Sequence, residues 1–201
     1  MKWPPSSTSS TSISLDLIIL SPPVSIWYRK RSGYLNYNMK STTMKRIAIG
    51  STRAGLTLKE GIISHLQEKG FDVDDLGMKR DGDFVPYYQS AANVAGAVSQ
   101  GEYEQAIIIC GTGAGSVIVA NKFKGVHAVF TSSEFEAHQA KAVNDANVIC
   151  FGEWITPVTH AVKIVDKWLA TPFGDGIAKD WVNFLREAVD GVKEIEKENF
   201  K

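Results

Sequence analysis

The chain has 201 residues, enough for one ordinary domain with a sizeable core, and its 22 basic residues balance 22 acidic ones. Because this balance produces no overall field, we expect no nucleic acid and no membrane among its partners. The two cysteines, Cys110 and Cys150, form no CxxC pair, so the sequence predicts neither a disulfide framework nor a zinc site. Their scarcity favours a reducing, cytoplasmic location.

Residues 1–43 differ in composition from the rest. They begin with a tract rich in Ser, Thr and Pro, MKWPPSSTSSTS, and continue with an apolar piece that Asp16 and Pro22 interrupt. That piece is too short and broken to span a bilayer, and it lacks the uninterrupted apolar core of a signal peptide. We therefore predict a disordered extension, or an over-extended gene model, followed by a single domain over 44–201. A mitochondrial presequence stays open because acids are scarce there and three basic residues follow: Arg29, Lys30 and Arg31.

Short apolar runs alternate with amphipathic patterns through the rest of the chain. The expected strands are 46–50, 71–77, 105–110, 127–130 and 147–151. The expected helices are 56–70, 86–99, 116–123, 134–143 and 158–169. Near-continuous apolar character in the last three strands is typical of a parallel sheet that is covered on both faces. The sequence thus predicts a Rossmann-like, doubly wound α/β fold with five parallel strands.

A further amphipathic stretch, 181–200, follows the Gly-rich break at Gly174 and predicts an extra C-terminal helix. Its apolar residues share one face: Trp181, Phe184, Leu185, Val189, Val192 and Ile195. The sheet is complete without this helix, so its apolar face could dock on its own domain or on a partner subunit. We favour a homodimer.

The segment ICGTGAGS, residues 109–116, joins the third strand to the next helix. In open parallel sheets, ligands bind outside the carboxyl ends of the strands, which is where Cys110 is expected. Glycines let backbone N–H groups turn outward, so the amides of Gly111, Gly113, Ala114, Gly115 and Ser116 form a candidate anion hole. The hydroxyl groups of Thr112 and Ser116 add donors, and a thiol beside a helix N-terminus is a candidate base. The plainer alternative is a tight turn after a buried small cysteine.

Two other glycine motifs do not fit this loop. A P-loop would end in Lys-Ser or Lys-Thr, and the dinucleotide fingerprint GxGxxG has a different spacing and follows the first strand.

The segment ICGTGAGSVIVANKFKGVHA resembles the hallmark of the ribose-5-phosphate isomerase B family, which includes the galactose-6-phosphate isomerase subunits. IAIGSTRAG and VNDANVICFG resemble the family's first-strand and fifth-strand regions, so the resemblance covers about 44–201. It implies aldose–ketose isomerisation of a small-molecule sugar phosphate through a cis-enediolate, by default ribose 5-phosphate to ribulose 5-phosphate, without a metal or other cofactor. It also implies that Cys110 is the base, that Thr112 orients the substrate, and that homodimers share active sites.

Several positions depart from the family pattern. The first loop reads Ser51, Thr52, Arg53 where the family usually has Asp-His, and Val143 replaces a histidine that serves in ring opening. Trp154 stands where an arginine is expected, and Phe84 where an aspartate is expected.

The remaining candidate site residues follow from the resemblance and from these departures. Asn144 keeps its family position, so it should bind a sugar oxygen, together with Ser51 and Thr52. The candidates for phosphate binding are Arg53, Lys179 and Arg186. Loss of the ring-opening histidine leaves two alternatives to ribose 5-phosphate: an open-chain substrate such as a tetrose phosphate, or a non-catalytic protein that binds a sugar phosphate.

Overall fold

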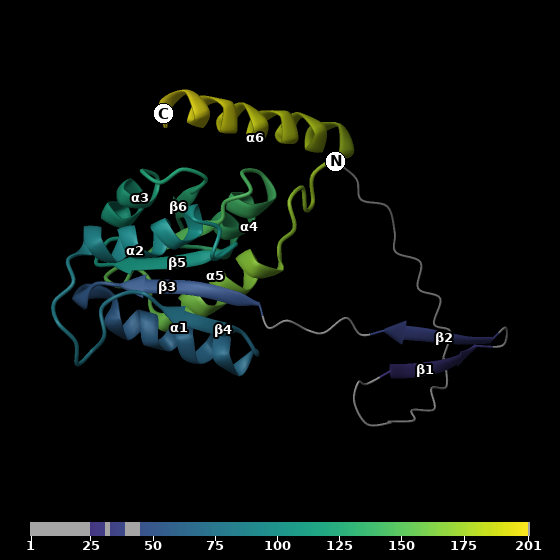
Figure 1. Ribbon diagram of the computed structural model, residues 1–201, viewed down its shortest axis with the longest axis horizontal. Helices are drawn as coiled ribbons and strands as arrows, with labels where there is room; N and C mark the ends of the chain where they lie inside the picture. Colours follow the sequence, from purple (N-terminus) through teal and green to yellow (C-terminus); the bar gives the residue numbers. More distant parts are fainter. Residues whose placement is uncertain (1–24, 31–32, 39–44, 201) are drawn as a thin grey trace. The chain divides into compact units, whose positions relative to one another are not determined.

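The computed structural model describes residues 25–30, 33–38 and 45–200, and it divides into two units, residues 1–43 and residues 44–201 (Figure 1). In the first unit, β1 (Ser25–Lys30) and β2 (Gly33–Asn38) pair as an antiparallel hairpin. This hairpin lies within the extension for which the sequence predicts disorder. The rest of that prediction lies outside the described residues.

The second unit contains one five-stranded sheet, and every strand pairing in it is parallel. Its strands are β3 (Arg46–Ser51), β4 (Asp72–Asp75), β5 (Ala106–Cys110), β6 (Ala128–Phe130) and β7 (Val148–Gly152). Their order across the sheet is β4-β3-β5-β7-β6, which puts β5 in the centre. The prediction of a Rossmann-like, doubly wound α/β fold is confirmed.

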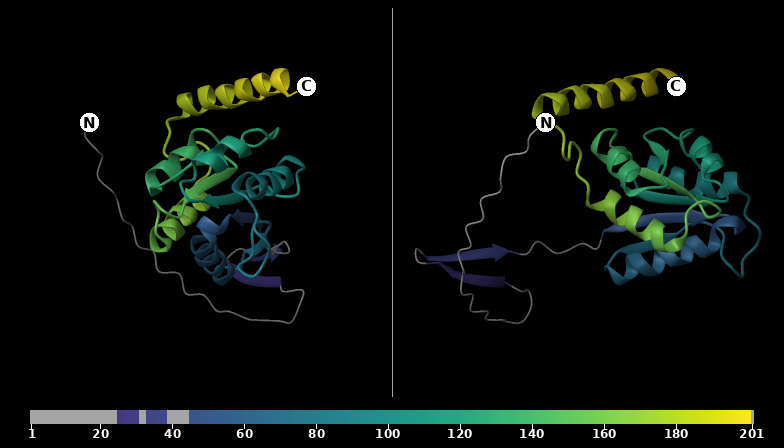
Figure 2. Two further views of the ribbon diagram at one scale, coloured as in Figure 1. Left: turned by 90° about the vertical axis from the view of Figure 1, so that its left-hand side faces the viewer. Right: turned by 180° about the vertical axis from the view of Figure 1, so that it is seen from behind.

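Helices cover both faces of this sheet (Figures 1 and 2). They are η1 (Arg53–Gly55), α1 (Leu56–Glu68), α2 (Tyr87–Ser99), α3 (Ala114–Ala120), α4 (Glu134–Ala142), α5 (Val158–Ala170) and α6 (Lys179–Asn199). One apolar layer joins the sheet to α1, α4 and α5, and another joins it to α2 and α3.

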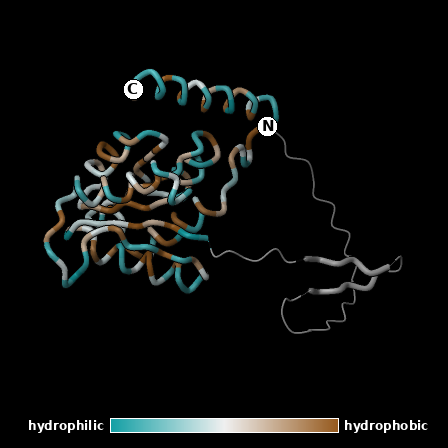
Figure 3. The backbone as a smooth tube through the Cα atoms, viewed as in Figure 1, coloured by the Kyte–Doolittle hydropathy of each residue, from teal (hydrophilic) through white to brown (hydrophobic). Residues whose placement is uncertain are grey.

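The two layers form because successive side chains along a buried strand point to opposite faces of the sheet. Figure 3 shows hydrophobic strands in the centre and more polar helices around them. In β5, Ile107 and Ile109 pack toward α1 and α5, while Ile108 packs toward α2 and α3. In β7, Phe151 and Cys150 divide between the faces in the same way, so Cys150 is a core residue, as expected.

Most element boundaries lie within a few residues of the expected ones. The first long helix ends just before Gly70, whose φ of 82° is the left-handed conformation that stops a helix. The largest difference is at α3, which begins at Ala114 instead of Ser116 and ends at Ala120. Gly113, with φ of 81°, is its N-cap, so the helix starts inside the glycine motif.

The C-terminal helix α6 has no buried residue. Its Leu185, Val189 and Val192 line a cavity of about 280 Å³ shared with residues around β6. Trp181 and Phe184 stack edge to face, with ring centroids 5.7 Å apart, and both remain largely exposed. Part of its apolar face is thus uncovered in a single subunit.

Candidate active site

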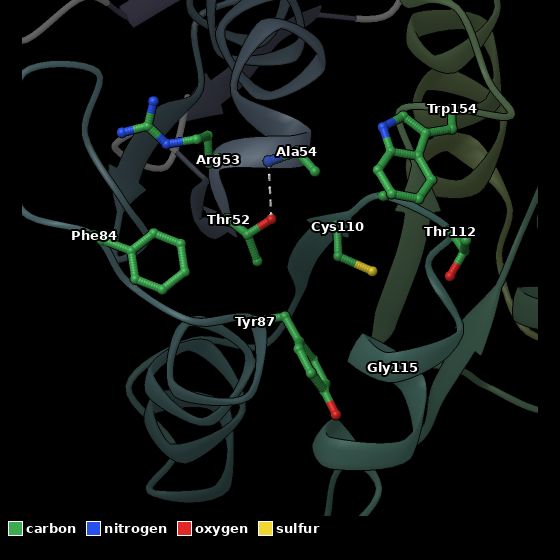
Figure 4. A pocket seen from close by; sticks show the side chains of 10 residues that line it. Thr52, Arg53, Ala54, Phe84, Tyr87, Cys110, Thr112, Gly115 and Trp154 are labelled. Atoms are coloured by element: carbon green, nitrogen blue, oxygen red, sulfur yellow. Dashed lines mark hydrogen bonds between the residues drawn. The ribbon is translucent and has the colours of Figure 1, made fainter.

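A cavity of about 350 Å³ opens at the carboxyl ends of β3 and β5, with the end of β7 on a third side (Figure 4). This is the position expected for a ligand site in an open parallel sheet. The residues that line it are Thr52, Arg53, Ala54, Phe84, Tyr87, Cys110, Gly111, Thr112, Gly115 and Trp154. The structure therefore brings the glycine loop and the first loop together.

Cys110 is the last residue of β5 and is only 6% exposed. The backbone N–H of Gly113 donates a hydrogen bond to its Sγ at 3.0 Å. In Figure 4 the sulfur points into the space between Trp154 and the helix that carries Gly115. Cys150, by contrast, lies wholly in the core, where burial raises the pKa of its thiol, so it stays protonated. The two thiols differ in environment, and only Cys110 faces the cavity.

The proposed anion hole is only partly open to the cavity. Gly111, Thr112 and Gly115 line it, and the amides of the first turn of α3 have no acceptor four residues before them. Gly113 already donates its N–H to Cys110, so this amide is not free for a ligand. Ala114 does not line the cavity either.

Ser116 does not take the place expected for a donor. Its side chain is completely buried, and its Oγ has no hydrogen-bond partner among the described residues. A fully buried hydroxyl group does not reach the cavity directly. Gly115, one residue earlier, is the part of this turn that lines the cavity.

The first loop contributes Thr52 and Arg53. Thr52 Oγ1 accepts a hydrogen bond from the N–H of Ala54 at 3.1 Å, which leaves its own O–H free to donate to a ligand. Arg53 is exposed and forms no ion pair within the described part of the chain. Ser51 is fully buried behind the cavity, so its predicted contact with substrate would have to be indirect.

Three aromatic residues of the cavity were not expected as site residues: Phe84, Tyr87 and Trp154. They are 67%, 48% and 74% exposed, which is unusual for such large apolar side chains. Phe84 and Trp154 drew attention only as departures from the family pattern. The available signal was the pair of glycines at 111 and 115, which leave room for rings to approach the loop.

A buried ion pair supports the segment that carries Phe84. Lys59 of α1 is 1% exposed, its Nζ lies 2.8 Å from Asp75 Oδ2, and it also donates to the carbonyl oxygen of Met78. A buried ammonium needs such partners, because desolvation without them is costly. These contacts attach the start of the 76–86 loop to α1.

The other predicted site residues lie elsewhere in the subunit. Asn144 lines the cavity under α6, beside His127 and Val143. Arg186 lines a third cavity, together with Asp145 and Phe173. Lys179 is the first residue of α6 and lines none of these three cavities. Asn144 precedes β7 and so lies at the amino end of that strand, whereas Cys110 ends β5. The structure does not bring these two groups together within one subunit.

His138, the histidine nearest in sequence to Val143, is engaged in a contact with another segment. Its Nε2 lies 2.9 Å from Asp175 Oδ2, and Gln139 contacts its Nδ1 at 3.2 Å. This pair ties α4 to the turn before α6. His138 does not line the Cys110 cavity.

Within residues 45–200, no three His, Cys, Asp or Glu side chains are grouped so that they could hold a metal ion. No helix in the described ranges is long and apolar enough to cross a membrane.

Comparison with known proteins connects this geometry to a family. The sequence model described as Ribose/Galactose Isomerase matches residues 47–184. The chain belongs to this family. It is therefore a sugar-phosphate isomerase that interconverts aldose and ketose, and the non-catalytic alternative is set aside.

Relatives within the ribose/galactose isomerase family act on different substrates. Ribose-5-phosphate isomerase B of Escherichia coli is 41% identical over 66% of this chain and 89% of its own length. A 4-deoxy-4-sulfo-D-erythrose isomerase of a Clostridium species is 35% identical over 78% of this chain and 98% of its length. D-erythrulose-4-phosphate isomerase of Pectobacterium atrosepticum is 35% identical over 66% of this chain and 88% of its own length.

A solved structure of the family has the same fold. Ribose-5-phosphate isomerase B of Mycoplasma genitalium, solved with bound ribulose 5-phosphate, superposes with a TM-score of 0.68 at 36% identity, covering 76% of this chain and 97% of that one.

Proposed function

We propose that this isomerase acts on an open-chain, four-carbon sugar with an anionic end group, through a cis-enediolate. The observation that carries this proposal is the chemistry of the cavity lining. The ten residues that one subunit contributes include no histidine and no carboxylate, and Val143 stands where the family has the histidine that donates a proton to the ring oxygen of a cyclic sugar. A tetrose phosphorylated at its last carbon cannot close a ring, so it needs no such acid.

Cys110, acting as a thiolate, removes the proton from the carbon next to the carbonyl group and returns it to the carbonyl carbon. In the same conversion the hydroxyl proton passes to the former carbonyl oxygen. The Thr112 hydroxyl lines the cavity beside Cys110 and orients these oxygens. The free amides of the first turn of α3, chiefly that of Gly115, stabilise the enediolate charge. Thr52 adds a hydroxyl donor to a substrate oxygen.

Arg53 binds the anionic end of the substrate. It is the only cation that lines the cavity, and no acid among the described residues competes for its guanidinium. Figure 4 shows that guanidinium on the opposite side of Thr52 from the sulfur. The reacting carbons would then lie near Cys110 and the anion near the outer end. The names of two relatives, which act on erythrulose 4-phosphate and a sulfo-erythrose, support the carbon count.

We also infer a homodimer with shared active sites. Asn144 and Arg186 line cavities beside residues 143–146, which precede β7 at the other end of the sheet from Cys110, so they could meet its substrate only from another subunit. Lys179, the first residue of α6, does not line the Cys110 cavity either. The uncovered apolar face of α6, with Trp181 and Phe184, supports association. A cytoplasmic location agrees with two cysteines that are both free thiols.

The test is an isomerisation assay on four-, five- and six-carbon aldose and ketose phosphates, and on a four-carbon sulfonate. We expect the four-carbon compounds to have the highest kcat/KM. Cys110→Ala should lower kcat by about 10²-fold or more, because it removes the base. Cys150→Ala is the matched control and should keep most of the activity, because Cys150 lies in the core. A higher kcat/KM for ribose 5-phosphate would reject the four-carbon proposal, and an active Cys110→Ala protein would reject the assigned base.

A further inference from the structure

The ring of Trp154 lies flat over the backbone of Gly111. A Cβ atom on Gly111 would lie 2.9 Å from Cη2 of Trp154 and 3.0 Å from both Cε2 and Cε3. These are alternate atoms of the six-membered ring, so nearly equal distances put that point over the ring centre. The backbone N–H of Trp154 also donates a hydrogen bond to the carbonyl oxygen of Gly111 at 3.0 Å, which fixes the two segments against each other.

Tyr87 covers the other end of the same loop. A Cβ atom on Gly115 would lie 2.8 Å from Cε2 and 3.0 Å from Cδ2 of the Tyr87 ring. Gly111 and Gly115 have no positive φ, unlike Gly113, so the backbone conformation does not require glycine at either position. The approach of the rings does require it. In Figure 4 the sulfur of Cys110 lies between these two rings.

Both rings line the cavity and remain exposed, so a ligand in the cavity could contact them. Trp154 is 74% exposed although one of its faces rests on Gly111. A large apolar surface beside a reactive group, with few polar neighbours, suits the C–H face of a sugar chain.

We propose that Trp154 and Tyr87 are the walls of a slot that admits an open, extended carbon chain and excludes cyclic and longer sugars, with Trp154 as the specificity-determining residue. This inference rests on the proposed function. The cis-enediolate is planar at its two reacting carbons, so it needs less space beside Cys110 and the two rings than a furanose ring, which carries substituents on both faces. The two rings thus select the open-chain form of the substrate, which needs no ring-opening acid.

The experiment compares kcat/KM for a four-carbon and a five-carbon aldose phosphate in the wild-type chain, Trp154→Ala and Trp154→Phe. Removing the wall should reduce the preference for four carbons about tenfold or more, since a change of pocket volume by even one carbon has effects of this size. Trp154→Phe, which keeps a flat ring, should restore most of the preference. Phe135→Ala is the matched control: Phe135 is 72% exposed but does not line the cavity, so the preference should not change.

A second measurement does not depend on turnover. Gly111→Ala should lower the melting temperature of the wild-type chain, because the new methyl group meets the Trp154 ring, but should have little effect in the Trp154→Ala background. Equal shifts in both backgrounds would overturn the packing that the inference uses. If the wild-type chain turns over the four-carbon compound but Trp154→Ala has the same ratio of kcat/KM for four- and five-carbon compounds, the inference is overturned and the proposed function stands. A wild-type chain that turns over neither compound would overturn the proposed function and the inference with it.

Discussion

At Gly113 three constraints meet in one residue. Its φ of 81° is left-handed, its N–H donates to Cys110 Sγ, and a Cβ atom there would lie 2.5 Å from Cδ2 of Phe130. Sequence reasoning found the glycine motif but assigned its amides evenly to the anion hole. The structure separates them: one amide holds the sulfur, and two glycines make room for aromatic rings.

Gly113→Ala should destabilise the protein by about 2–4 kcal/mol, since it adds the backbone cost of a left-handed alanine to an overlap with Phe130. It should also reduce activity, because the contact with Cys110 would shift. Denaturant unfolding measures the first effect. Gly125→Ala is the control: Gly125 has φ of 75° and nothing within 4 Å of an added Cβ, so only the backbone cost of about 1 kcal/mol applies. Equal losses in both variants would contradict the overlap with Phe130.

At the scale of elements, periodicity and apolar runs were enough to predict all five strands of the sheet and the helices that cover it, because the covering helices bury one face and the central strands bury both. The start of α3 was misplaced, since a helix that begins at a left-handed glycine has no side-chain cap to mark it. The aromatic walls could not be predicted, because Trp154 and Tyr87 reach the loop from distant segments.

A polar cluster links β3, β4 and the segment before β5. Asp74 Oδ2 accepts hydrogen bonds from Tyr103 at 2.8 Å and from Arg46 at 2.7 Å, and these bonds hold the pKa of the Asp74 carboxyl below its usual range. A lowered pKa in the folded state means that the ionised carboxylate stabilises the fold. That contribution is complete above the unfolded pKa of about 3.9 and is lost as the pH falls through the lower, folded value.

Asp74→Asn should therefore lower the free energy of unfolding near neutral pH, and the difference from wild type should shrink below about pH 4. The measurement is denaturant unfolding across a pH series. Asp72→Asn serves for comparison, because Asp72 contacts Arg46 only at 3.7 Å and should have a smaller effect. A wild-type advantage that grew as the pH fell would show that the sign is wrong.

At the scale of the whole molecule, the predicted site residues fall into two groups. Cys110, Thr112, Thr52 and Arg53 surround one cavity, while Asn144 lies under α6 at the opposite end of the sheet. The resemblance and the departures from it gave all of them roles, yet sequence alone could not show that one subunit holds them apart. That separation depends on which end of a strand each residue occupies, and it makes the dimer proposal testable.

If active sites are shared, two inactive variants should restore activity when mixed. A mixed dimer of Cys110→Ala and Asn144→Ala subunits would contain one site with both defects and one intact site. After unfolding and joint refolding, about a quarter of the wild-type activity should return, since half of the dimers are mixed and each has one intact site of two. Cys110→Ala mixed with Thr112→Ala is the control, because these residues share a cavity and no site would be intact. No recovery in the first mixture would contradict shared sites.

The wholly parallel sheet also has a consequence for how the chain folds. The central strand β5 pairs with β3 and β7, so Ile107 must meet both Ile49 and Ile149. Each pairing closes a long intervening segment that contains two α-helices and a strand. Such pairings form late, because the entropy of loop closure is lost before the contacts compensate for it. Cys110 ends β5 and has its position only when both neighbours have docked. Recovery of enzymatic activity during refolding should therefore follow the last phase of assembly, and helix content should return before it.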